Sequence, residues 1–190
     1  MMEILKTFYT SERMEWRNWL AENFEKENEV WFVFPMKNSG EKSLSYNDAV
    51  EEALCFGWID STIKNLDSLH RIQRFSPRKK NSGYSRANIE RLIWLESQGL
   101  IHNNVRESII EIIKTPYEFP ADIIEMIRRE DKVWKNYEQF PETYKRIRIA
   151  YIDAARNRPL EFRKRLENFV SKTRENKLIK GFGGIEKYYK

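Results

Sequence analysis

The stretch Ser45–Asp60, SYNDAVEEALCFGWID, changes its hydrophobic period partway along. Ser45 and Asp48 form a capping-box pattern, and the apolar residues after them recur at helical spacing. Gly57 is a natural C-terminal cap, because glycine readily adopts the left-handed conformation that ends many helices. From Trp58 onward, apolar and polar residues alternate as on a half-buried strand. The stretch therefore predicts a helix that turns directly into a strand.

Further helix and strand patterns lie on both sides of this stretch. Upstream, aromatic residues at helical spacing predict a helix over about 11–25, and the run 30–34 of β-branched and aromatic residues predicts a buried strand. Downstream, the turn-forming residues Asn65, Asp67 and Ser68 break the alternation, and residues 69–75 are expected to return as the second arm of a hairpin with residues 58–64, which Pro77 ends. Further helices are expected around 89–98 and 105–113.

Beyond the two prolines of residues 115–120, every apolar pattern is helical. The sequence therefore predicts an α+β fold, with a small, mostly antiparallel sheet and flanking helices, followed by a C-terminal helical bundle. We expect an α+β domain over residues 1–116, a helical module over 117–175 and a tail over 176–190.

Composition excludes several classes of protein. A chain of 190 residues with 41% hydrophobic and 14% aromatic residues can build a core, so wholesale disorder is excluded. The longest apolar run, 30–36, is far too short for a membrane span, and the N-terminus lacks the apolar stretch of a secretory signal. The single cysteine excludes an internal disulfide. We expect a bacterial, cytoplasmic protein.

The net charge of +5 hides an asymmetry along the chain. Residues 1–57 carry a net charge of −5, residues 58–120 carry +3, and residues 121–190 carry +7. A basic region of this kind can attract phosphate, nucleic acid or an anionic surface, but charge alone favours an ordinary solvated face.

Three motifs carry a family resemblance. They are EEALCFGWID at 51–60, QRFSPR at 73–78 and YSRAN at 84–88, and they resemble the YdeI/OmpD-associated family, also described as bacteriocin-protection proteins. Residues 154–158 and 163–166 are similar to the family's C-terminal helical module. The resemblance extends over about residues 15–175. It implies a link to envelope stress, to resistance against cationic antimicrobial peptides or bacteriocins, and to an outer-membrane porin, with a periplasmic location.

Basic residues are densest between Arg71 and Arg91, where seven accompany one acid, Glu90. The guanidinium fork binds carboxylate or phosphate with two parallel hydrogen bonds, so arginines here can grip an anionic ligand. Strand alternation places the Trp58 indole on the same face of the strand as Asp60, where it could line a pocket. Nearby serines could donate hydrogen bonds to the ligand. The candidate ligand-binding residues are Trp58, Asp60, Arg74, Arg78, Ser82 and Ser85. The alternative is an internal ion pair between Asp60 and an arginine that only stabilises the hairpin.

No set of catalytic residues can be recognised, which favours a non-catalytic role and leaves an enzyme as a further alternative. Cys55 lies among apolar residues without a histidine partner positioned to activate it. His70 and His102 stand alone, so neither a metal site nor a cofactor is predicted.

The sequence thus predicts a binder of an anionic small molecule or protein partner through the Trp58–Arg78 region. The alternative is a nucleic-acid-binding protein that uses the basic C-terminal helices. The residues that would carry this alternative are Lys145, Arg146, Arg148, Arg156, Arg158, Arg163, Lys164 and Arg165.

Overall fold

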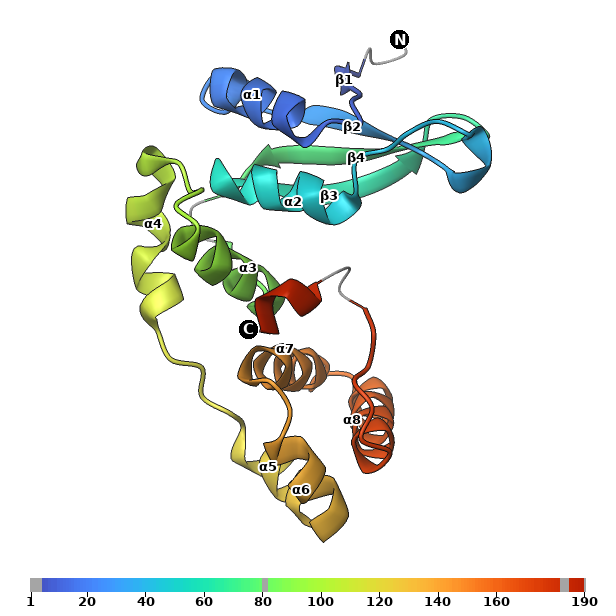
Figure 1. The fold of residues 1–190 in the computed structure, drawn as a ribbon, viewed down its shortest axis with the longest axis vertical. Coiled ribbons are helices and arrows are strands. Elements are labelled where there is room, and N and C mark those ends of the chain that lie inside the picture. The colour runs from blue at the N-terminus through green and yellow to red at the C-terminus, as the bar shows by residue number, and fades with distance from the viewer. Residues whose placement is uncertain (1–4, 80–81, 182–184, 190) are drawn as a thin grey trace. The chain divides into compact units, whose positions relative to one another are not determined.

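A computed structural model describes residues 5–79, 82–181 and 185–189 (Figure 1). The chain forms two compact units. The first unit comprises Met1–Gly83 and Leu95–Ile110, and the second comprises Tyr84–Trp94 and Glu111–Lys190.

The first unit contains a four-stranded sheet in the order β1-β2-β4-β3. Its strands are β1 (Thr7–Phe8), β2 (Val30–Pro35), β3 (Trp58–Asn65) and β4 (His70–Pro77). The β2–β4 and β3–β4 pairs are antiparallel, and β1 alone runs parallel to its neighbour β2. The predicted α+β class and the mostly antiparallel sheet are confirmed.

The junction between helix α2 (Tyr46–Cys55) and strand β3 forms as predicted. The Ser45 hydroxyl caps the helix by accepting a hydrogen bond from the Asp48 amide at 3.1 Å. At the other end, Gly57 has φ +71° and donates its amide to the Leu54 carbonyl at 3.1 Å. This left-handed conformation favours glycine and lets the chain reverse directly into the sheet.

Helix α1 (Arg13–Asn23) supplies aromatic residues to the core of the first unit. The buried Trp16 ring meets Phe32 of β2 and Phe75 of β4 edge-on, with centroids 5.1 and 5.5 Å apart. Trp19 meets Trp58 at 5.8 Å in the same geometry. Such aromatic pairs bind α1 to one face of the sheet. Two further elements complete this unit, namely the 3-10 helix η1 (Lys37–Ser39) and helix α4 (Asn103–Lys114), most of which belongs to it.

The second unit is helical. Its elements are most of α3 (Arg86–Ser97), α5 (Ala121–Arg128), α6 (Asp131–Glu138), α7 (Glu142–Asp153), α8 (Pro159–Arg174) and the 3-10 helix η2 (Ile185–Tyr189). Its core is formed by buried residues of α5 to α8, including Ile123, Ile127, Val133, Tyr144, Ile152 and Phe169.

The segment after α8 folds back onto α7. The Tyr144 hydroxyl accepts a hydrogen bond from the Ile179 amide at 3.0 Å, and the Arg148 guanidinium donates to the Ile179 carbonyl. Tyr144 and Arg148 of α7 therefore bind both the amide and the carbonyl of Ile179. The glycine-rich stretch that begins at Gly181 lies largely outside the described residues.

Candidate functional site

Two of the predicted ligand-binding residues lie on β3. Trp58 is only 1% exposed, and its indole nitrogen donates to the Phe24 carbonyl at 3.0 Å, so its side chain belongs to the core. Asp60 is partly exposed and accepts a hydrogen bond from the Tyr46 hydroxyl. Asp60 therefore anchors the first turn of α2 to the sheet.

Arg74 is engaged in an ion pair. Its Nε donates to Glu29 Oε2 at 2.6 Å, and its terminal nitrogen lies 3.4 Å from the hydroxyls of Ser61 and Ser76. The hydrogen bond from Arg74 lowers the pKa of the Glu29 carboxyl below its usual value. Arg74 therefore forms an internal ion pair, as in the alternative to ligand binding, but its partner is Glu29 and not Asp60.

Arg78 turns toward its own loop, where it donates to the carbonyls of Ser82 and Gly83 at 3.0 and 2.7 Å. The Ser82 hydroxyl donates to the Lys79 carbonyl, and Ser85 accepts from the Asn88 amide at the start of α3. The structure thus brings Arg78 and Ser82 together and gives Trp58, Asp60 and Arg74 other partners. A ligand role for these six residues stays a prediction.

Cys55 is fully buried, and burial raises the pKa of its thiol to about 12. A thiol protonated at neutral pH is a poor nucleophile. The His70 ring lies 2.9 Å from both Asp67 and Glu41, while His102 packs on Phe24 with ring centroids 4.8 Å apart. Within the described residues, no group of side chains is arranged to hold a metal ion.

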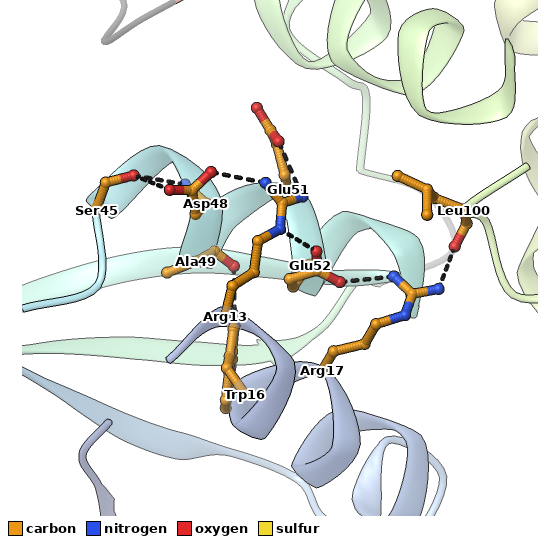
Figure 2. A network of polar contacts seen from close by, with 9 residues as sticks. All are labelled: Arg13, Trp16, Arg17, Ser45, Asp48, Ala49, Glu51, Glu52 and Leu100. Carbon is orange, nitrogen blue, oxygen red and sulfur yellow. Dashed lines mark hydrogen bonds and ion pairs between the residues drawn. The ribbon is translucent and has the colours of Figure 1, made fainter. Parts of the chain in front are cut away.

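A network of charged residues between α1 and α2 was not predicted (Figure 2). Arg13 contacts three carboxylates, with nitrogen–oxygen distances of 2.7 Å to Asp48, 3.1 Å to Glu51 and 2.5 Å to Glu52. Arg17 binds the other oxygen of Glu52 at 2.6 Å. Glu51 and Glu52 are 0% and 2% exposed. We call these five residues the arginine clamp.

The electrostatics of the arginine clamp are those of a closed ion-pair network. Burial lowers the pKa of Arg13 and Arg17, but the hydrogen bond to Glu52, the charge of Glu52 and smaller contributions from neighbouring groups together outweigh this effect and leave both pKa values raised. Arg17 also donates to the Leu100 carbonyl at 2.7 Å, which adds the segment after α3 to the network. Buried carboxylates need such partners, because an unpaired buried charge is costly. The clamp is built to hold elements together.

One signal for the clamp was present in the sequence. Arg13 and Arg17 are four residues apart and therefore share a helix face with Trp16 and Leu20, which are fully buried. Charges on the buried face of a helix require buried partners.

The second unit contains a cavity of about 510 Å³, lined by residues of α7, α8 and the segment after α8. We call it the basic pocket. Its charged lining residues are Arg148, Glu161, Lys164, Arg165 and Lys180. Four are cations, and the only acid among the described lining residues is Glu161, which pairs with Arg165 at 2.7 Å.

The two arginines of the basic pocket are held in place. Arg148 is 6% exposed and is fixed by the Ile179 carbonyl. Arg165 donates to the Tyr151 carbonyl at 2.7 Å, and its guanidinium carbon lies 3.7 Å from the centroid of the Tyr151 ring. By contrast, Lys164 and Lys180 are exposed at the pocket. The pocket therefore combines fixed guanidinium groups with flexible ammonium groups, which suits an anion.

The second unit also contains a buried carboxylate at its first helix. Glu90 of α3 is 2% exposed and forms an ion pair with Arg86 of the same helix. It also accepts two hydrogen bonds, of 2.6 and 2.8 Å, from Arg146 of α7. Hydrogen bonding to Glu90 raises the pKa of Arg146. This trio joins α3 to α7 and has the character of a structural ion pair.

Comparison with known proteins divides the sequence into two parts. Residues 8–108, more than half of the chain, match a family described as a domain of unknown function (DUF8412). Residues 116–176 match the family described as bacteriocin-protection, YdeI or OmpD-associated, which confirms the family resemblance over the helical part. The motifs at 51–60, 73–78 and 84–88 lie in the first match.

No curated protein and no solved structure matches the chain. In the described part of the chain, no helix is both long and apolar enough to cross a lipid bilayer. The chain therefore belongs to the family of the domain of unknown function DUF8412 and carries, over residues 116–176, a module of the bacteriocin-protection, YdeI or OmpD-associated family.

Proposed function

We propose that the protein is a non-catalytic binder of a small anionic molecule, which it takes up in the basic pocket. The observation that carries this proposal is the uncompensated positive charge around a cavity of about 510 Å³, where four cations face one carboxylate and three of them remain in excess. Small-molecule sites are typically cavities of about 300–1,000 Å³ with a few convergent polar groups. A phosphate or carboxylate group would satisfy the excess positive charge.

The fixed side chains favour a compact ligand over an extended polyanion. Arg148 is buried, and Arg165 is stacked on Tyr151, so neither needs to be ordered when the ligand binds. Pre-organised donors reduce the entropic cost of binding. Asn168 of α8 also lines the pocket and supplies an amide for neutral oxygens of the ligand.

Nucleic acid is the second candidate ligand, and the ion pairs of the basic helices weigh against it. Four of the eight basic residues expected to contact nucleic acid are already paired with carboxylates. These pairs are Lys145–Glu142, Arg146–Glu90, Arg156–Asp122 and Arg165–Glu161. Paired cations attract phosphate weakly, because the field of each is partly cancelled by its partner.

We propose protection against bacteriocins or cationic antimicrobial peptides during envelope stress as the physiological setting. The support is the match of residues 116–176 to a family described as bacteriocin-protection, since this segment holds the α7 and α8 walls of the pocket. The proposed location is the cytoplasm.

Calorimetric titration with inorganic pyrophosphate at low salt tests the binding proposal. The double variant Lys164→Gln/Lys180→Gln should weaken binding about tenfold or more, because two charge-assisted contacts are removed. The matched control is Arg163→Gln/Lys172→Gln, which removes the same charge from α8 at positions that do not line the pocket. The control should change the dissociation constant less than twofold. Equal weakening by both variants, or no binding by the natural chain, would overturn the proposal.

A duplex DNA of random sequence serves as the competing ligand in the same assay. If DNA binds more tightly than pyrophosphate, loses affinity steeply with salt and is weakened equally by both double variants, the nucleic-acid function replaces the one proposed here. If DNA binding is weak beside that of pyrophosphate, the small-anion function stands.

A further inference from the structure

The first unit contains a separate cavity of about 700 Å³ at the start of α2. It is lined by the ends of β2, β3 and β4 and by residues just before α2. We call it the apolar groove. All of its lining residues belong to the first unit, so it is independent of the basic pocket.

The groove exists because the apolar face of the sheet extends beyond the helices that cover it. Directly opposite residues of antiparallel strands point to the same face, which places Phe34 beside Arg71 and Ile63 beside Gln73. Phe32 and Phe75 occupy the same face nearer to α1, where Trp16 covers them. In Figure 1 the ends of β2 and of the β3–β4 hairpin lie together, away from α1.

Apolar side chains at the groove remain open to solvent. Ile63 is 57% exposed and Tyr46 is 46% exposed, although both line the cavity. The Tyr46 ring packs edge-on against Phe34, with centroids 6.2 Å apart, and the buried Leu44 lies beside them. A ligand with an apolar body would cover this surface and remove it from water.

The charged side chains at the groove are both cations. Lys37 and Arg71 are exposed, and within the described residues neither forms an ion pair with a carboxylate. Among the described lining residues none is acidic. Asp60 does not line the groove and is held by the Tyr46 hydroxyl. The groove therefore joins an apolar surface to a purely cationic one.

We propose that the apolar groove binds a single amphipathic anion, a long-chain carboxylate. Its tail would lie over Phe34, Leu44 and Ile63, and its carboxylate would be held by Arg71 and Lys37. Charge complementarity selects this ligand: a neutral amphiphile would leave both cations unused, and a cationic one would be repelled. A hollow of this size has room for one chain and does not present a protruding surface to a bilayer.

Titration with decanoate, below the concentration at which it forms micelles, tests this proposal by calorimetry and amide NMR. Decyltrimethylammonium provides the same tail with the opposite charge. The variant Arg71→Gln should weaken decanoate binding about tenfold, and Ile63→Ser should weaken it several-fold. The matched control is Lys64→Gln, because Lys64 follows Ile63 on β3 and points to the opposite face, over the Trp31 ring. The control should change affinity less than twofold.

Three outcomes would overturn the proposal. Decyltrimethylammonium could bind as tightly as decanoate, or Lys64→Gln could weaken binding as much as Arg71→Gln. In the third, the NMR shifts caused by decanoate would fall on residues 148–181 and not on 34–46 and 63–73. That result would assign the anion to the basic pocket, so the groove would fail while the proposed function survived. Arg71 and Ile63 are exposed, so these variants should fold normally.

Discussion

The arginine clamp of the first unit and the basic pocket of the second use arginine in opposite ways. In the clamp, Arg13 and Arg17 face three carboxylates, two of them fully buried. In the basic pocket, two arginines and two lysines face one carboxylate. In the first arrangement both cations are paired with carboxylates, and the network holds helices together. The second arrangement has positive charge left over for a ligand. What distinguishes the clamp from the basic pocket is whether the cations are paired with carboxylates, and not how many basic residues each contains.

The largest expected effect comes from breaking the clamp. Glu52→Ala removes the shared partner of Arg13 and Arg17 and should lower the free energy of unfolding of the first unit by about 3 kcal/mol, because two partly buried cations lose their main counter-charge. Hydrogen exchange of the α1 amides would report this locally. The control is Glu22→Ala, at an exposed position of α1, which should lower the free energy of unfolding by less than about 0.5 kcal/mol. Equal exchange rates in the two variants would show that the clamp is not stabilising.

A smaller effect is expected at the surface ion pair of the first unit. Arg74→Ala should cost at most about 1 kcal/mol at pH 7, because the Arg74–Glu29 pair is about one-third exposed and screened by water. The pKa of Glu29 is lowered by Arg74, so the pair stabilises the fold above the unfolded-state pKa of Glu29 and is lost as pH falls through the folded value. Chemical denaturation from pH 7 down to pH 2.5 should therefore show the difference from the natural chain disappearing in acid. A difference that persists in acid, or complete unfolding, would mean that Arg74 acts through other contacts.

Removing a cation from the basic pocket should not destabilise the fold, in contrast to the variants of the two ion-pair sites. Lys164→Gln should leave the free energy of unfolding within about 0.5 kcal/mol of the natural value or raise it slightly, because this lysine is exposed and lies among other cations. Thermal unfolding at low salt would measure this. A clear destabilisation would indicate that Lys164 has a structural partner, which would align the pocket with the clamp.

The smallest effect is expected at His70, a partly exposed group of the first unit. Hydrogen bonding to Asp67, with a further contribution from Glu41, raises its pKa above the ordinary value of about 6.5. The raised pKa stabilises the fold below the unfolded-state value, and this contribution is lost as pH rises through the folded value. NMR titration should find the elevated pKa, and Asp67→Asn should lower it. An unchanged pKa in that variant would remove Asp67 as the cause.

Much of the fold could be predicted because its signals are local. The Ser45 cap and the Gly57 reversal depend on neighbouring residues, and both form as expected. The alternation predicted after Trp58 holds only as far as Asp60, because the register of β3 against β4 shifts between Asp60 and Ile63. Strand β1 was missed, since two residues carry no period, and its parallel pairing with β2 joins segments far apart in the chain.

The candidate sites could be predicted much less well. Arg74 was expected to meet Asp60 or a ligand, but the partner is Glu29, 45 residues away in the chain. Glu52 resembles an ordinary surface acid of a helix, and only the approach of α1 buries it. The basic pocket needs Lys180, from beyond α8, to meet Arg148 of α7. Of these pairings, only that of the clamp leaves a trace in the sequence, which is the four-residue spacing of Arg13 and Arg17 on the buried face of α1.

The amino-acid sequence alone was sufficient for the α+β class, for the junction between α2 and β3, and for the family of the helical module. These features depend on backbone hydrogen bonding and burial among near neighbours, which periodicity and capping residues encode. Tertiary packing determined which cations are neutralised and which remain available to a ligand. Electrostatic energy depends on distance and burial in space, and the paired groups here are brought together from distant parts of the chain.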